Sequence, residues 1–289
     1  MNKGNEGDTS ALYVWNGLSM FWGTSFHTDP HLHNTLQLVF DIDRQFKLKD
    51  IASDWTSYSA AIIKNGHMHQ LDSCGSIQLF IYLDKDSRFA KELTDRYLLN
   101  VGIASFDDPV LSKLSTRFFK KLLVNNDCKR LLEGCQFILK TLIHDDSPKE
   151  LDDRIRQAIR YITSTPNKKF KVKAVAEHVC LSESRLRHIF KEQVGQPIQN
   201  FILWMKVVDS LGLVLKGNPI GRTAIETGFW DSAHMYRSYK ELLGVAPGKI
   251  KAFEKELKIV TCTHGNLHVL RTEISNSLDA VEIKKTIEI

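Results

Sequence analysis

A repeat in the second half of the chain limits the fold more than any other sequence feature. In each copy, apolar residues recur at helical spacing, a tight turn follows, and a second apolar helical pattern begins. The first copy begins at Val172 and the second at Ile220, 48 residues later. The copies also agree in letters, because Phe190-Lys191-Glu192 corresponds to Tyr239-Lys240-Glu241, and a glycine and then a proline follow each. The sequence therefore predicts two units of helix, turn and helix.

These units have the dimensions of modules that bind the major groove of DNA. The second helix of such a unit fits the groove and presents its outer residues to the base edges. Between the units, Ile198 to Lys216 has a largely helical pattern, and its nineteen residues would make a rod of roughly 28 Å. Successive major-groove faces on one side of a duplex lie about 34 Å apart. We therefore expect one chain to place both second helices in adjacent turns of one groove.

The positive charge of the chain is concentrated around this repeat. Residues 149–258 hold 20 Lys and Arg against 12 Asp and Glu, whereas residues 1–148 hold 16 against 18 and residues 259–289 hold 3 against 4. Lysine and arginine that neutralise phosphates release condensed counterions, and this release favours binding to nucleic acid. Such a distribution is expected of a nucleic-acid-binding module, although a merely solvated basic surface would have the same composition.

The second unit carries the most specific pattern in the chain. Its residues are Ile220, Ala224, Gly228, Phe229, Met235, Arg237, Tyr239, Lys240, Gly244 and Pro247. On this pattern, the stretch from Ile155 to Phe253 resembles the DNA-binding domain of the AraC/XylS family of transcription regulators. The resemblance implies a sequence-specific DNA-binding regulator, usually an activator, whose partners are double-stranded promoter DNA and RNA polymerase.

The resemblance also assigns the residues that contact DNA. They lie on the two second helices: Ser184, Arg185, Arg187, His188 and Lys191 on the first, and Ser232, Ala233, Tyr236, Arg237 and Lys240 on the second. Arginine can bind guanine O6 and N7 together, so Arg187 and Arg237 are the strongest candidates for base contacts, with a surface ion pair as the alternative. Phosphate contacts are expected from lysines, namely Lys168, Lys169, Lys171, Lys173, Lys191, Lys206 and Lys240.

The connecting helix departs from the family pattern. Trp204 stands where the family commonly has an arginine, and Ser210 stands where it commonly has a small alanine. Together with Asp209, Trp204 makes this helix less basic than the family pattern implies. We therefore expect phosphate anchoring to depend on other positions.

The pattern of the N-terminal part predicts β-structure followed by helices. Short β-like runs include Thr35–Phe40, Ala60–Ile63 and Ile77–Tyr82, and the turn signals Asn65-Gly66 and Cys74-Gly75 predict hairpins, so an antiparallel sandwich or barrel is expected. Leu93, Tyr97 and Leu98 then predict one helix. Residues 111–122 and 132–142 predict two more, as an antiparallel pair or a dimer seam.

A polar break at Asp145-Asp146-Ser147-Pro148 marks the expected domain boundary. The predicted fold class is α+β multidomain, with a cupin-like N-terminal β-barrel, a helical extension, and an all-α C-terminal domain with two helix-turn-helix motifs. The corresponding ranges are 10–86 for the sensor barrel, 87–147 for a helical dimerisation region and 149–255 for the DNA-binding domain. A tail of unknown role covers 256–289, in which Thr263 to Asn266 has the pattern of a hairpin turn.

Histidines cluster near the N-terminus. His31-x-His33-x-x-x-Gln37, followed by His67-x-His69, stands in the order of the two halves of a cupin metal site. Residues two apart on a strand point the same way, and imidazole suits Zn, Cu, Fe or Ni. However, Gln37 stands where metal-binding cupins usually have glutamate, which removes a charged ligand. We therefore expect these five residues to line a ligand site without a metal or cofactor, with metal binding as the alternative.

The cysteines and the apolar runs indicate the cellular compartment of the protein. The five cysteines are scattered and never form a C-x-x-C pair, which predicts reduced, mostly buried thiols rather than a disulfide framework or a structural zinc site. No run of 18 apolar residues occurs, and the first eight residues lack the apolar core of a secretory signal. We therefore expect a cytoplasmic protein without a membrane partner.

Three functional classes stay open from the sequence. The favoured one is a regulator, without enzyme activity, whose N-terminal domain senses a small-molecule effector or mediates homodimerisation. The second is a metal-dependent cupin oxygenase or isomerase, which would need stoichiometric metal on His31, His33 and His69. No paired acid and base, Ser/His/Asp arrangement or phosphate-binding glycine loop supports other chemistry. The third is an adaptor whose basic domain binds another protein.

Overall fold

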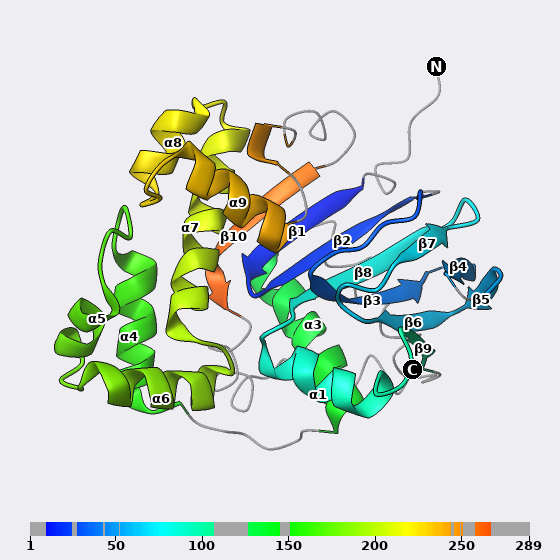
Figure 1. The fold of residues 1–289 in the computed structure, drawn as a ribbon, viewed down its shortest axis with the longest axis horizontal. Coiled ribbons are helices and arrows are strands. Elements are labelled where there is room, and N and C mark those ends of the chain that lie inside the picture. Colours follow the sequence, from blue (N-terminus) through cyan, green and yellow to red (C-terminus); the bar gives the residue numbers. More distant parts are fainter. Residues whose placement is uncertain are drawn as a thin grey trace.

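A sheet-rich N-terminal region and a helical C-terminal region meet along one long helix (Figure 1). The computed structural model describes residues 10–24, 28–42, 44–51, 53–106, 127–144, 151–243, 246–248, 250 and 258–266. The helix predicted at 111–122 and the boundary predicted at 145–148 lie outside these residues. The domain ranges given above therefore stay predictions.

Two sheets form the N-terminal region. The larger sheet has seven strands in the order β10-β1-β2-β8-β3-β6-β9, and the smaller has three in the order β5-β4-β7. The strands are β1 (Ala11–Asn16), β2 (Leu18–Thr24), β3 (Thr35–Asp41), β4 (Phe46–Asp50), β5 (Thr56–Tyr58), β6 (Ala60–Ile63), β7 (His69–Asp72), β8 (Ile77–Asp84), β9 (Ile103–Ser105) and β10 (Lys258–Asn266). Within the described residues, β10 and β9 are open edges of the larger sheet, so these strands form no closed barrel.

The three predicted strand segments are present as β3, β6 and β8, but the two predicted hairpins are wrong. Asn65-Gly66 lies between β6 and β7, and Cys74-Gly75 lies between β7 and β8. Each turn carries the chain from one sheet to the other instead of joining paired strands. Gly66 and Gly75 both have a φ of +72°, which glycine adopts at little cost. The turn residues mark a chain reversal, whereas strand pairing depends on residues far apart in the sequence.

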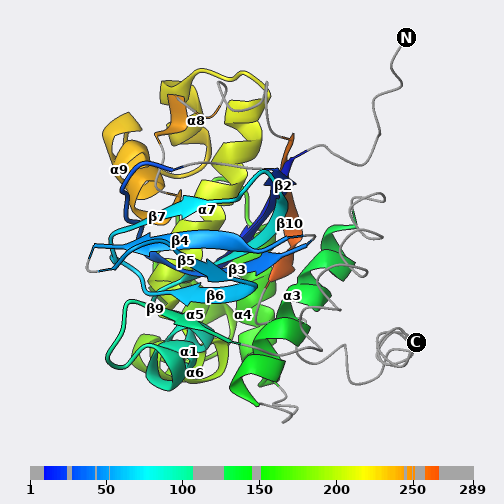
Figure 2. The same cartoon turned by 90° about the vertical axis from the view of Figure 1, so that its right-hand side faces the viewer.

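Both faces of the larger sheet are buried, because alternate residues of a strand point to opposite sides. In β8, Leu79 and Ile81 belong to an apolar cluster shared with α1 (Arg88–Tyr97) and α3 (Cys128–Ile143). Phe80 between them belongs to a second cluster, which includes Phe46 and Leu71 of the smaller sheet. The N-terminal region is therefore layered, with the smaller sheet on one face of the larger sheet and helices on the other (Figure 2).

The helical region contains the two predicted helix pairs and the rod between them. Its helices are α4 (Asp153–Ser164), α5 (Val172–His178), α6 (Glu183–Val194), α7 (Ile198–Leu215), α8 (Ile220–Glu226) and α9 (Ser232–Leu243). The pair α5 and α6 lies near one end of α7, and the pair α8 and α9 lies near the other (Figure 1). Phe201 and Met205 of α7 pack with the first pair, whereas Val207 and Leu211 pack with the second. Each half of α7 thus completes one apolar core.

By length and composition, α7 is apolar enough to cross a membrane, with a mean hydropathy of 1.4. More than half of it is buried inside the protein, as in the core helix of a compact domain. Within the described residues, no other helix meets these criteria of length and hydropathy.

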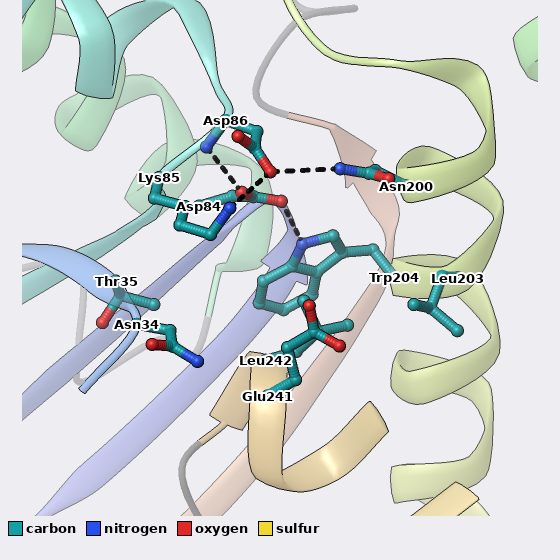
Figure 3. A pocket seen from close by; sticks show the side chains of 10 residues that line it. All are labelled: Asn34, Thr35, Asp84, Lys85, Asp86, Asn200, Leu203, Trp204, Glu241 and Leu242. Carbon is teal, nitrogen blue, oxygen red and sulfur yellow. Dashed lines mark hydrogen bonds and ion pairs between the residues drawn. The ribbon is translucent and has the colours of Figure 1, made fainter. Parts of the chain in front are cut away.

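Trp204 of α7 joins the helical region to the sheets. Its indole N–H donates to Asp84 Oδ2, at the end of β8, at a distance of 2.6 Å, and both side chains are buried (Figure 3). One turn earlier, the Asn200 amide donates to an Asp86 carboxylate oxygen at 3.4 Å. Val14 of β1 also belongs to the apolar cluster of α7, α8 and α9. The tryptophan that departs from the family pattern is therefore a contact between the two regions.

Trp204→Phe removes the indole N–H and keeps most of the apolar surface. Because Asp84 is only 6% exposed, its carboxylate would lose a hydrogen bond that water replaces poorly. We expect the free energy of unfolding to fall by about 1–3 kcal/mol. Urea denaturation followed by circular dichroism measures this change. Asn200→Ala, at the longer bond, should cost less, and equal stability of the Trp204 variant and the wild type would contradict the assignment.

The strand β10 corrects two predictions. Residues 263–266, which have the pattern of a hairpin turn, lie within β10, and β10 adds a parallel strand beside β1. Cys262 of β10 forms a disulfide with Cys128 at the start of α3, with the two Cα atoms 5.8 Å apart. The prediction of reduced thiols is therefore wrong for these two cysteines. They are 134 residues apart in the sequence, and only the pairing of β10 with β1 brings them together.

Removal of this disulfide should destabilise the protein. A crosslink that closes a loop of 134 residues restricts the unfolded chain, and chain entropy assigns this restriction roughly 4–5 kcal/mol as an upper range. We expect the Cys128→Ser/Cys262→Ser double variant to be less stable in urea than the oxidised wild type. Cys180→Ser, at an exposed free thiol, is the matched control and should leave stability unchanged. A double variant as stable as this control would show that the disulfide contributes nothing.

Candidate DNA-binding surface and histidine cluster

The first helix pair exposes the predicted contact residues of α6. Cys180 adopts a left-handed φ of +53°, and the Leu181 N–H donates to the Ala176 carbonyl at 2.9 Å, which closes the turn after α5. The Ser182 hydroxyl then accepts from the Arg185 N–H at 3.2 Å and caps α6. The exposed side chains on this helix include Ser184, Arg185, His188 and Lys191, and Arg187 is half-exposed.

The second pair repeats this arrangement. The Phe229 N–H donates to the Ala224 carbonyl at 2.9 Å, and the Asp231 carboxylate accepts from the His234 N–H at 2.6 Å at the start of α9. Met235 and Tyr239 point into the core. Each of the predicted contact residues is exposed, namely Ser232, Ala233, Tyr236, Arg237 and Lys240. Both sets of candidate residues therefore lie on outward faces. They stay accessible in the presence of the N-terminal region.

Gly228 allows the turn of the second pair to lie against the loop between α4 and α5. Its φ is +85°, and a Cβ at this position would lie 2.1 Å from the Asn167 carbonyl oxygen. No side chain fits that gap, because the obstructing atom belongs to the backbone. A glycine is therefore required both for the conformation and for the close approach.

Gly228→Ala should lower the free energy of unfolding by more than about 1 kcal/mol, because alanine is strained at positive φ and would displace the Asn167 backbone. Thermal or urea unfolding measures the loss. The matched control is Gly221→Ala in α8, where the nearest atom to the new Cβ is the Ser232 hydroxyl at an ordinary 3.6 Å. The control should be as stable as the wild type or more stable. Tolerance of alanine at both positions would contradict the close packing of the turn.

The two arginines proposed to contact bases differ in their surroundings. Arg187 forms an ion pair with Glu183 one turn earlier on α6, and its Nε donates to Glu183 Oε1 at 3.0 Å. His188 Nε2 also lies 3.9 Å from a Glu192 carboxylate oxygen. Within the described residues, Arg237 forms no ion pair and is exposed. The alternative of a surface ion pair therefore applies to Arg187. Arg237 is the stronger candidate for a base contact.

Two of the lysines predicted to contact phosphate have partners within the protein. Lys168 is 3% exposed and forms an ion pair with Asp209 of α7, so its prediction as a phosphate contact is wrong. The half-buried Lys206 donates to the Gly228 carbonyl at 2.8 Å. The sequence did not separate these lysines from the others because their partners lie on distant segments. The exposed members of the set are Lys169, Lys171, Lys173, Lys191 and Lys240.

Two cations and the Asp231 carboxylate lie near the start of α9. Burial, followed by the charges of Lys206 and Arg237, lowers the pKa of His234. Trp230 lies two residues before α9 and is 90% exposed, and no sequence pattern marked it as a site residue. Its neighbour Phe229 is buried, so the two aromatic residues point in different directions. Only one aromatic side chain of this turn enters the core, which leaves Trp230 beside the candidate surface.

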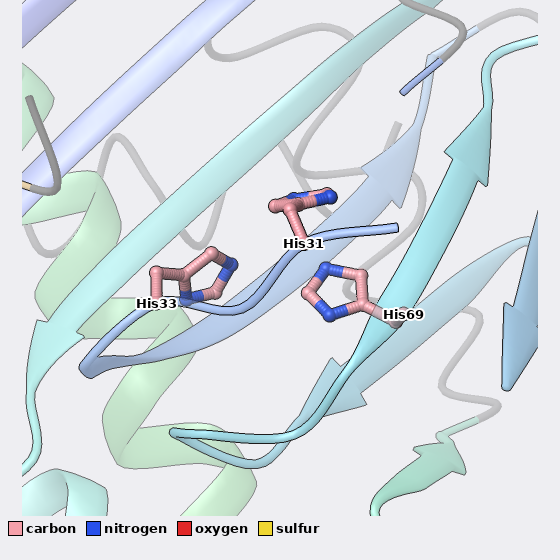
Figure 4. Close-up of side chains that lie close together, drawn as sticks. All are labelled: His31, His33 and His69. Atoms are coloured by element: carbon pink, nitrogen blue, oxygen red, sulfur yellow. The ribbon is translucent and has the colours of Figure 1, made fainter. Parts of the chain in front are cut away.

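Three of the N-terminal histidines lie together. One ring nitrogen from each of His31, His33 and His69 lies within 4.8 Å of the others (Figure 4). The backbones of His31 and His69 form a β-bridge, with both N–H···O distances at 3.0 Å, and their ring centroids are 4.4 Å apart. The Gln37 side chain contacts the His33 ring. His67 lies apart from this group, because its Nε2 is 3.1 Å from the Asp50 carboxylate. The structure thus brings four of the five predicted ligand-site residues together.

The environment of this cluster favours neutral imidazoles. Burial lowers the pKa of His69 to about 4, and the positive charge that His31 and His33 would carry if protonated adds to this effect. Burial also lowers the pKa of His33. At neutral pH each of these two rings therefore keeps one unprotonated nitrogen.

A small polar pocket lies where β8, α7 and α9 meet (Figure 3). Its lining residues are Asn34, Thr35, Asp84, Lys85, Asp86, Asn200, Leu203, Trp204, Glu241 and Leu242. The Trp204 indole and Asp84 already bond to each other across it. The pocket therefore marks the junction of the two regions.

Comparison with known proteins identifies the helical region. Residues 175–252 match a family model described as a helix-turn-helix domain. The arabinose operon regulatory protein of Escherichia coli (strain K12) is 30% identical over 140 residues, which cover 47% of this chain and 46% of that protein. Its namesake in Salmonella typhimurium is 29% identical over 136 residues, which cover 46% of this chain and 47% of that protein.

The chain spans about half the length of these curated relatives. Among solved structures, ToxT from Vibrio cholerae O395 shares 14% identity, covers 86% of this chain and 98% of its own, and has a TM-score of 0.40. The family model assigns a helix-turn-helix domain to residues 175–252, and about half of the chain is similar to the two arabinose operon regulatory proteins.

Proposed function

We propose that the protein is a sequence-specific, DNA-binding transcription regulator of the AraC type that acts as an activator. In this proposal the pairs α5–α6 and α8–α9 are two helix-turn-helix units, and α6 and α9 enter successive turns of the major groove. One observation carries the proposal: both helices bury their apolar side chains and expose the basic and polar residues that the family uses for DNA contacts.

The spacing of the two units supports the same function. The 18 residues of α7 give it a length of about 27 Å, close to the roughly 34 Å between successive groove faces. The ion pair of Asp209 with Lys168 ties α7 to the loop before α5, and the hydrogen bond of Lys206 ties it to the turn before α9. The Ser210 and Tyr239 hydroxyls add a buried hydrogen bond of 2.8 Å between α7 and α9. These contacts would hold the units at a fixed separation on DNA.

The N-terminal region would regulate this activity. We assign it a cupin-like sensor role, with an effector site that includes His31, His33, Gln37 and His69. Homodimerisation through residues 87–147 and contact with RNA polymerase follow from the family resemblance. The curated relatives are named as regulators rather than enzymes, which supports a regulator over a cupin enzyme.

Arg237→Ala tests the proposal. Loss of a bidentate contact to guanine should weaken binding to the specific promoter sequence by about 1–3 kcal/mol, which is roughly 5-fold to 150-fold, and relax specificity at one base pair. Fluorescence anisotropy at fixed salt, with fragments found by genome-wide mapping of bound DNA, measures the affinity.

The matched control for this test is Arg44→Ala, which removes the same charge from an exposed position in the N-terminal region. Its affinity should equal that of the wild type. Circular dichroism verifies that both variants are folded. Unchanged affinity of a folded Arg237 variant would count against the DNA-binding assignment and favour an adaptor that binds protein.

A further inference from the structure

The histidine cluster is defined as His31, His33 and His69, and hydrogen bonds to main-chain carbonyls orient its three rings. In all three residues Nδ1 lies at hydrogen-bond distance from a main-chain carbonyl two residues away. The distances are 2.9 Å from His31 to Asp29, 3.1 Å from His33 to Thr35 and 2.9 Å from His69 to His67. A carbonyl oxygen only accepts, so the neutral rings of His31 and His69 carry their proton on Nδ1. Their Nε2 atoms are therefore left with a lone pair. In His33, Nε2 also faces an acceptor, the Gln37 side-chain oxygen, so its proton can lie on either nitrogen.

This arrangement resembles that of histidines that bind metals. A ligating histidine almost always donates its other ring N–H to a carboxylate or a main-chain carbonyl, which fixes the tautomer and the ring orientation. Here three neighbouring rings show the same pattern, although they come from two segments, one before β3 and one at β7. The three carbonyl contacts hold the three rings in fixed orientations.

Two of the Nε2 atoms have specific surroundings. His69 is 1% exposed, and its Nε2 is buried without a hydrogen-bond partner among the described residues. A buried acceptor without a partner costs about 1–3 kcal/mol. His33 Nε2 contacts the Gln37 side-chain oxygen, which a cation at this position would displace or recruit as a further ligand. A positive ion between the rings would satisfy the lone pairs that the protein leaves open.

We propose that His31, His33 and His69 bind a divalent transition-metal ion through their Nε2 atoms, and that Zn²⁺ fits this site. Zinc binds imidazole nitrogen at about 2.0–2.1 Å, and three neutral histidines leave a fourth position for water or a small ligand. Binding requires the ring nitrogens, now within 4.8 Å of one another, to move closer. The half-exposed His31 can rotate to allow this. The proposal deepens the effector-site assignment made above for the same residues, and its test does not involve DNA binding.

The neighbouring His67 provides an internal control. It lies two residues from His69, but its Nε2 pairs with the Asp50 carboxylate at 3.1 Å and does not join the cluster. Its main-chain carbonyl holds the His69 ring, and a substitution of the side chain leaves that carbonyl in place. His67→Ala should therefore retain the metal, whereas His31→Ala and His69→Ala should not.

The test is a titration of the full chain with Zn²⁺ in competition with a chromophoric chelator, after treatment with EDTA. All samples carry Cys180→Ser, so that the exposed thiol does not compete. We expect one Zn²⁺ per chain in the wild type and in His67→Ala, and an affinity at least about 10-fold weaker in His31→Ala and His69→Ala. X-ray absorption of the zinc complex should show a first shell of nitrogen and oxygen.

If the buried His69 variant fails to fold, the variant of the half-exposed His31 still tests the proposal. Circular dichroism verifies that each variant is folded. Absence of stoichiometric Zn²⁺ in the wild type would overturn the proposal. Equal affinity of the folded His31→Ala variant and the wild type would also overturn it, since it would show adventitious binding elsewhere. Because no step uses DNA, a failure here is distinct from a failure of promoter binding.

Discussion

The burial of α7 is the constraint on which the rest of the structure depends. Its first half completes the apolar core of α4, α5 and α6, and its second half completes the core of α8 and α9. The same helix contacts the sheets through the indole N–H of Trp204. A rigid helix shared by two cores fixes how the outer faces of α6 and α9 are presented, because neither pair can rotate without breaking its own packing. The candidate DNA-binding surface is therefore a consequence of how α7 is buried.

The positions where this chain departs from the family pattern make polar contacts from α7 to other elements. Trp204 bonds to Asp84 of β8, Asp209 pairs with Lys168, and Ser210 shares a hydrogen bond with Tyr239. Each residue looks unfavourable for DNA binding when α7 is considered alone. In the folded protein each one satisfies a buried or half-buried polar group on another element. The reduced basic character of this helix thus reflects its place in the interior.

The N-terminal histidines show a similar division between local and tertiary information. Their spacing indicated a shared strand face, and the absence of a glutamate at Gln37 argued against a metal. The geometry favours a metal, because main-chain carbonyls set the same tautomer in His31 and His69. The buried Nε2 of His69 also has no hydrogen-bond partner in the described part of the chain. The sequence could not distinguish His67 from the others. In the structure its Nε2 contacts the Asp50 carboxylate, outside the cluster. A neutral three-histidine site needs no carboxylate if the rings are held in this way.

The sequence by itself determined the repeated helix pairs, their caps and turns, and the outward residues of α6 and α9, because helical periodicity, capping and glycine conformations act over a few residues. It also determined β3, β6 and β8 from their apolar runs. Only the tertiary structure decided which strands pair across Gly66 and Gly75, that Cys128 meets Cys262, and that Lys168 is buried. These outcomes depend on contacts between segments that are distant along the chain, and no local pattern specifies which distant surface will cover a given residue.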